Sequence, residues 1–234
     1  MLSSRLLRAL YSPDSYALVL LLILVTYALS TALTATWATS LIVAVQIGVV
    51  WVTLRAARAR RTTLAFANAA LGVAALAAIA SLVVNQQFHT DSIVAWVSCA
   101  LYLAAPGAIV RHLLRRRTVD AETVMGAVAA YLMAGMFFAF LYRALGIVQP
   151  HPAFFGAQGP GTFSQDLFFS FTTLTTTGYG DLTPAGNPGQ SFAVLEMLTG
   201  QLFLIAAVGK VVSSWRPGRA PREARRRVRR ASAA

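Results

Sequence analysis

The chain has 234 residues, of which 57% are hydrophobic and only 12% are charged. Soluble domains carry about 25% charged residues, so this composition excludes an ordinary soluble protein and indicates a membrane protein. The formal net charge is +12, from 20 basic and 8 acidic residues. The lone cysteine, Cys99, lies in an apolar run and has no intrachain partner for a disulfide or a metal site.

Apolar segments long enough to cross a bilayer recur along the chain. A transmembrane helix needs about 20 mostly apolar residues. Six segments qualify, over residues 16–35, 38–54, 64–84, 93–110, 124–145 and 191–212. The sequence therefore predicts an all-α membrane protein with six transmembrane helices.

Basic residues gather at particular ends of these spans. The clusters are Arg5 and Arg8, then Arg55, Arg58, Arg60 and Arg61, then Arg111 and Arg115 to Arg117, and finally the arginines of residues 216–230. With six crossings they all fall on one side of the membrane, and the opposite loops are almost free of basic residues. The positive-inside rule then predicts a multi-pass protein of the cell membrane with both termini in the cytoplasm.

The same arginines divide the chain into three parts. Residues 1–117 form a four-span N-terminal membrane domain, residues 118–213 a two-span domain, and residues 214–234 a basic cytoplasmic tail. We expect the tail to contact anionic lipid at the inner membrane surface. Because a tail beside a membrane span needs no other reason for its charge, nucleic-acid binding is not expected.

A long loop separates the fifth span from the sixth. Within it, residues 163–175 are apolar enough to be helical but too short to cross a membrane. Pro160 and Gly161 break the chain before this segment, and Thr162 and Gln165 have the spacing of a capping box, which predicts a helix from Phe163. The result is a re-entrant hairpin, whose irregular backbone must be buried in protein or line a water-filled cavity.

The segment TTLTTTGYGDLTP (172–184) follows that helix. Gly178 and Gly180 have no Cβ and can adopt conformations in which successive carbonyls point the same way. Such a row of oxygens, with the Thr176 hydroxyl, can replace the water around a desolvated cation. One chain supplies one strand of this lining, so a closed ring requires several copies.

The segment resembles the signature of the potassium channel family, Thr-x-Gly-Tyr-Gly-Asp. The resemblance covers residues 124–213 and implies a homotetramer in which the fifth and sixth spans are the outer and inner pore helices and 163–175 is the pore helix. The residues that it implies for K+ binding in the filter are Thr176, Thr177, Gly178, Tyr179 and Gly180. It also places Asp181 at the outer mouth and a gating hinge at Gly200, and requires no cofactor besides the permeant K+.

Some positions depart from the family pattern. Thr177 stands where the family most often has valine or isoleucine. Because its added hydroxyl could alter selectivity, a non-selective cation channel is the alternative function. Thr172 stands where some members carry a glutamate, and Phe168 and Phe169 stand where many carry tryptophans. Gly200 has a second interpretation, because glycine also permits close packing of membrane helices.

Two ionisable residues lie inside the last two spans. Arg143 is near the outer end of the fifth span and Glu196 is in the outer half of the sixth. Since buried charges are usually paired, one hypothesis is that they support the filter by interacting behind it, directly or through Thr172 or Thr173. The alternatives are an Arg143 that reaches the outer interface and a protonated Glu196 bonded to hydroxyls of the pore helix.

Other function classes fit the sequence poorly. The fourth span, 93–110, contains no arginine, so we expect weak or no intrinsic voltage gating. The sequence has no HExxH or GxSxG motif and no paired intramembrane acids with a histidine, which argues against an enzyme. Only one half of the chain has an interrupted segment, whereas the inverted repeats of a secondary transporter predict two.

Overall fold

The computed structural model describes residues 16–32, 48–50, 52–53, 72, 87–115, 120–149 and 151–214. These residues form helices and no strand. The elements are α2 (Tyr16–Ala32), α5 (Gln87–Arg115), α6 (Ala121–Val148), the short 3-10 helix η1 (Gly156–Gln158), α7 (Phe163–Leu174) and α8 (Gly189–Ser214). Outside the described residues lie the predicted span 64–84 except for residue 72, most of the predicted span 38–54, and the tail beyond residue 214.

The all-helical prediction is confirmed for the described part of the chain. Two helices there are long and apolar enough to cross a membrane, Ala121–Val148 and Gly189–Lys210, and α2 contributes a shorter apolar stretch, Tyr16–Leu29. The two long helices coincide with the fifth and sixth predicted spans. The total of six spans stays a prediction.

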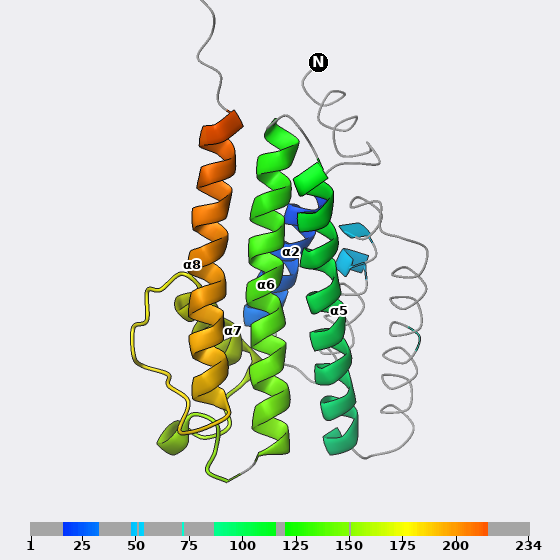
Figure 1. Ribbon diagram of the computed structural model, residues 1–234. Helices are drawn as coiled ribbons and strands as arrows, with labels where there is room; N and C mark the ends of the chain where they lie inside the picture. Colours follow the sequence, from blue (N-terminus) through cyan, green and yellow to red (C-terminus); the bar gives the residue numbers. More distant parts are fainter. Residues whose placement is uncertain are drawn as a thin grey trace, which may run out of the picture.

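Helix α6 is the element around which the others are arranged. It begins after Asp120, whose Oδ1 accepts the Thr123 N–H at 2.8 Å and so satisfies one of the free donors of the first turn. Each of α2, α5, α7 and α8 packs against α6. In Figure 1, α6 lies between α8 and α5, and the short α7 lies beside the half of α8 that follows the 149–188 loop.

The ends of these helices fall into two groups. The end of α5, the start of α6 and the end of α8 lie at the top of Figure 1, and the connection 151–188, which includes η1 and α7, occupies the lower half of the view. Tyr16, at the start of α2, belongs to the first group, because its ring centroid is 6.4 Å from that of His112 near the end of α5. These described helix ends therefore share one end of the bundle. Most of the arginine clusters lie outside the described residues, and the orientation in the membrane stays a prediction.

Aromatic side chains join the loop before α7 to the helices. Tyr142 of α6 has its ring centroid 5.0 Å from that of Phe169 of α7, and Phe155 of the loop lies 5.5 Å from Phe169. Phe154 lies 4.8 Å from Phe155. Burial of such rings is strongly stabilising, so the cluster holds the loop and the start of α7 against α6.

Candidate functional site

Helix α7 begins as the sequence predicts. The Gln165 N–H donates to Thr162 Oγ1 at 3.3 Å, and the Thr162 N–H donates to Gln165 Oε1 at 2.7 Å, which together form a capping box. The helix ends at Leu174, one residue before the predicted end. The predicted short helix between the two spans is therefore confirmed.

Backbone hydrogen bonds tie the predicted filter segment to the last turn of α7. The N–H groups of Thr177 and Gly178 both donate to the Thr172 carbonyl, at 2.8 and 3.0 Å, and the Thr176 N–H donates to the Thr173 carbonyl at 3.0 Å. The Thr172 hydroxyl points elsewhere, because it donates back to the carbonyls of Phe168 and Phe169. Thr172 thus holds this segment through its main chain.

The backbone of this segment alternates in handedness. Positive φ angles occur at every second residue, with 58° at Thr176, 52° at Gly178 and 84° at Gly180. An alternating sign of φ turns successive carbonyls toward the same side of the chain. Glycine adopts these angles freely, whereas a β-branched residue such as Thr176 is strained there. Strain of this kind costs about 1–3 kcal/mol and concentrates at functional sites.

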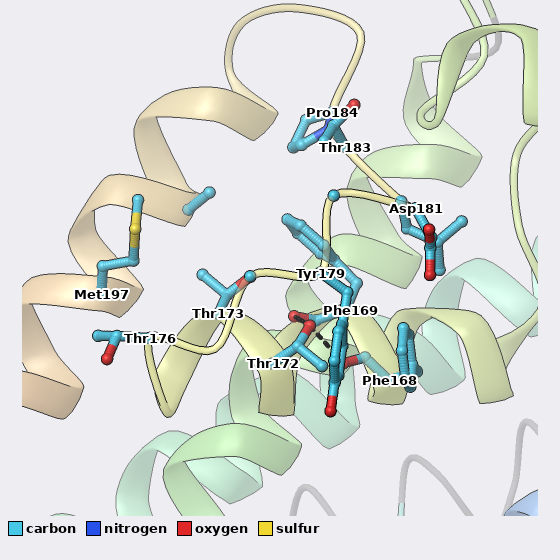
Figure 2. A pocket seen from close by; sticks show the side chains of 14 residues that line it. Phe168, Phe169, Thr172, Thr173, Thr176, Tyr179, Asp181, Thr183, Pro184 and Met197 are labelled. Carbon is cyan, nitrogen blue, oxygen red and sulfur yellow. Dashed lines mark hydrogen bonds between the residues drawn. The ribbon is translucent and has the colours of Figure 1, made fainter.

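A cavity of about 280 Å³ lies between this segment, α7 and α8. Figure 2 shows Met197 of α8 facing the cavity from one side and Thr172 and Thr173 of α7 lining it from below. The Tyr179 ring stacks on Phe168, with centroids 5.9 Å apart and planes at 10°. Tyr179 is still 67% exposed within one chain, so much of its ring is available to a neighbouring molecule.

The added hydroxyl of Thr177 has a partner. Its Oγ1 lies 2.9 Å from Thr175 Oγ1, and the Thr175 hydroxyl also lies 2.7 Å from the Phe171 carbonyl. Because the Phe171 carbonyl only accepts, Thr175 donates to it and Thr177 donates to Thr175. The departure from valine or isoleucine at this position therefore adds one hydrogen bond between the segment and the end of α7.

The chain after the segment is attached to the preceding loop. Gln158 Nε2 donates to the main-chain carbonyl of Asp181, and the Ala185 N–H donates to the Phe154 carbonyl at 2.9 Å. Asp181 is exposed, and its place at the outer mouth stays a prediction.

Gly200 makes a close packing contact. A Cβ added there would lie 2.1 Å from the Leu174 carbonyl oxygen at the end of α7. The same carbonyl accepts the Tyr131 hydroxyl of α6 at 3.0 Å. Three helices therefore meet at the Leu174 carbonyl, and the packing interpretation of Gly200 has a direct structural basis.

The hypothesis that Arg143 and Glu196 interact is wrong within this chain. Arg143 Nη1 donates to the Gly161 carbonyl at 2.9 Å, just before α7. Glu196 is fully buried, and its carboxyl contacts the Tyr142 and Ser170 hydroxyls at 2.6 and 2.5 Å. Neither Thr172 nor Thr173 links the two. Of the alternatives, the contact of Glu196 with a pore-helix hydroxyl is the one found.

Sequence reasoning missed several polar residues around α7. These are the half-buried Tyr131 and the buried Tyr142, Asp166 and Ser170. Asp166 is fully buried, and neither of its carboxylate oxygens has a hydrogen-bond partner among the described residues. A polar side chain in an otherwise apolar segment is the signal that was available, but it does not reveal which distant residue is the partner.

Two helices long and apolar enough to cross a membrane, a short capped helix and an extended glycine segment lie together within residues 121–214, and this is the region in which a known family matches. Residues 126–215 match the family described as "Ion channel". A stretch of 81 residues is 36% identical to the inward rectifier potassium channel Kirbac3.1 of Paramagnetospirillum magnetotacticum.

That match covers 35% of this chain and 25% of the relative, so the chain spans about a quarter of the length of the curated protein that it matches. No solved structure matches the chain. Residues 126–215 are therefore similar to an ion-channel domain, and the 81-residue stretch is similar to part of a potassium channel.

Proposed function

We propose that the protein is a potassium-selective channel that conducts K+ passively through a pore formed by four copies of the chain. The observation that carries this proposal is the alternating backbone of residues 176–180, tied to the end of α7. Four such strands around an axis present rings of carbonyl oxygens, which replace the hydration shell of K+.

In this proposal each part of the segment has a role. The residues that supply oxygens to K+ are Thr176, Thr177, Gly178, Tyr179 and Gly180. The Thr176 hydroxyl adds the innermost ligand, and Asp181 lies at the outer mouth. Helix α7 presents its C-terminal end, which carries about half a negative elementary charge, to a cation below the filter. The function is conduction rather than catalysis, and the only ion required is the permeant one.

The surface of α8 supports an assembly of several copies. Apolar side chains along this helix are strongly exposed in the single chain, among them Leu198 at 55%, Leu202 at 64% and Ile205 at 60%. Neighbouring copies, together with lipid, would cover this surface. We propose the cell membrane as its location, with both termini cytoplasmic, because the ends of α5 and α8 and the start of α6 share one end of the molecule. The arginine-rich tail would contact anionic lipid there.

The experiment that tests this proposal is a measurement of reversal potential. The purified protein is reconstituted in planar bilayers with opposing K+ and Na+ gradients. We expect a reversal potential close to the K+ equilibrium value. A reversal potential near zero would contradict selectivity and would indicate a pore for monovalent cations in general.

That second candidate, a non-selective cation channel, is favoured by one observation, the extra hydroxyl of Thr177. The substitution Thr177→Val removes the hydrogen bond to Thr175 and keeps the β-branched shape. A hydrogen bond of this kind contributes about 1 kcal/mol, so we expect a modest change in the duration of open periods and no loss of K+ selectivity. If the valine variant gains K+ selectivity that the original protein lacks, the second candidate is correct.

A further inference from the structure

A buried polar network joins the three helices around the predicted filter. Tyr142 of α6, Ser170 of α7 and Glu196 of α8 are all fully buried. The Ser170 Oγ lies 2.7 Å from the Gly135 carbonyl of α6 and 2.5 Å from Glu196 Oε1. The Tyr142 hydroxyl lies 2.6 Å from Glu196 Oε2. These are three short oxygen–oxygen contacts, and each needs one hydrogen.

The hydrogens of the hydroxyl groups are too few for these contacts. A serine hydroxyl and a tyrosine hydroxyl each have one hydrogen to donate, a carbonyl has none, and an ionised carboxylate has none. If Glu196 were ionised, two hydrogens would serve three contacts. Ser170 would then face two acceptors with a single hydrogen, which leaves one contact of 2.5–2.7 Å repulsive.

A proton on Glu196 supplies the third hydrogen that the three contacts need. With the proton on Oε1, the carboxyl donates to Ser170, Ser170 donates to Gly135, and the Tyr142 hydroxyl donates to Oε2. Every contact then has one hydrogen. A proton on Oε2 does not have this effect, because the Ser170 hydroxyl would still face two acceptors.

The surroundings of Glu196 favour the same state. An ionised carboxylate away from water is costly unless a cation compensates it. The cation that the sequence suggests as its partner, Arg143, is bonded to the Gly161 carbonyl instead. Among the described residues, the Glu196 carboxyl forms its hydrogen bonds with the two hydroxyls and with no cationic group.

From these contacts we infer that Glu196 is held as a neutral carboxylic acid and is the positioning residue that fixes α7 to both α6 and α8. The way in which α8 packs against α7 supports the same role. Glu196 and Gly200 lie one turn apart on one face of α8, and they meet Ser170 and Leu174, which lie one turn apart on α7. The neutral acid therefore fixes the helix that carries the predicted filter.

Infrared spectroscopy of the reconstituted full chain tests the protonation directly. At neutral pH we expect a carbonyl stretching band of a protonated carboxyl group that disappears in Glu196→Gln. The band should remain in Asp166→Asn, which removes the other fully buried carboxyl of the described residues. If Glu196→Gln removes no such band, the inference is wrong.

A second variant covers the case in which Glu196→Gln does not fold. Tyr142→Phe keeps the ring and removes the hydroxyl that donates to Oε2. Loss of this donor strengthens the carbonyl bond, so the band is expected to move to higher frequency. A protonated-carboxyl band that does not respond to Tyr142→Phe would assign it to another residue and overturn the inference.

An electrical measurement tests the positioning role, and this part rests on the proposed channel function. The side-chain amide introduced by Glu196→Gln offers a donor to Ser170 and an acceptor to Tyr142. We therefore expect the rate at which the K+ current declines after the channel opens to stay within about twofold of that of the original protein. Glu196→Ala leaves buried hydroxyls unsatisfied and should accelerate decay about five- to thirty-fold. Equal rates in the two variants would overturn the positioning role. The infrared result does not depend on conduction, so a protein without current would contradict the proposed function alone.

Discussion

Replacing Gly178 by alanine is expected to abolish K+-selective current while leaving the chain folded. Gly178 has a φ of 52°, in the left-handed region, where a residue with a Cβ costs about 1–2 kcal/mol. In the proposed tetramer this cost occurs in every copy at the same level of the pore. The backbone relieves it by rotating, which turns carbonyl oxygens away from the ion. The measurement is the reversal potential under opposing K+ and Na+ gradients.

Gly159→Ala is the matched control. Gly159 also has a positive φ, of 84°, and an added Cβ meets nothing within 4 Å at either glycine. The ψ of −165° at Gly159 places this residue in a region that is populated essentially by glycine alone, so the backbone penalty is at least as large as at Gly178. Gly159 nevertheless lies in the loop before α7 and outside the predicted filter. We expect this variant to retain selective current. If both variants lose selectivity to the same extent, the effect comes from general destabilisation and the role assigned to Gly178 is not supported.

Replacing Gly200 by alanine should have the largest effect on stability. The added Cβ would lie 2.1 Å from the Leu174 carbonyl oxygen, which is main chain and cannot swing aside. Helix α8 must then move away from α7, and overpacking of this kind costs about 1–3 kcal/mol or more. We expect a lower temperature of thermal unfolding in detergent, together with reduced current.

The matched control lies on the same helix. An added Cβ at Gly209 meets nothing within 4 Å, and alanine is the better helix former, so Gly209→Ala should leave the protein as stable as before or slightly more stable. A hinge role for Gly200 makes a different prediction: Gly200→Ala would alter opening and closing without lowering the unfolding temperature. That outcome would refute the packing role.

The features predicted correctly from sequence depend on neighbouring residues. The start of α7 follows from Thr162 and Gln165, which are three positions apart, and the left-handed positions in 176–180 include two glycines. Such signals act within one turn of backbone and need no knowledge of the rest of the chain. The long apolar segments that became α6 and α8 are local signals as well.

The partners of buried polar groups were not predictable in this way. Glu196 is 26 positions from Ser170 and 54 from Tyr142. Two membrane charges at similar depth suggested a pair, but depth does not specify which face of a helix a side chain occupies. Arg143 instead donates to the main-chain carbonyl of Gly161. Because every residue has a main-chain carbonyl, the sequence does not indicate which one an arginine will contact.

The contact between α7 and α8 lies in the first half of α8. Ser170 and Leu174 meet Glu196 and Gly200, and the helix continues for a further 14 residues to Ser214. At 1.5 Å per residue this second half is about 20 Å long. It also packs on α6, because the Phe203 ring centroid lies 5.4 Å from that of Tyr131. Tyr131 in turn donates to the Leu174 carbonyl, two residues before the first predicted K+ ligand, so the second half of α8 and the end of α7 share one neighbour on α6.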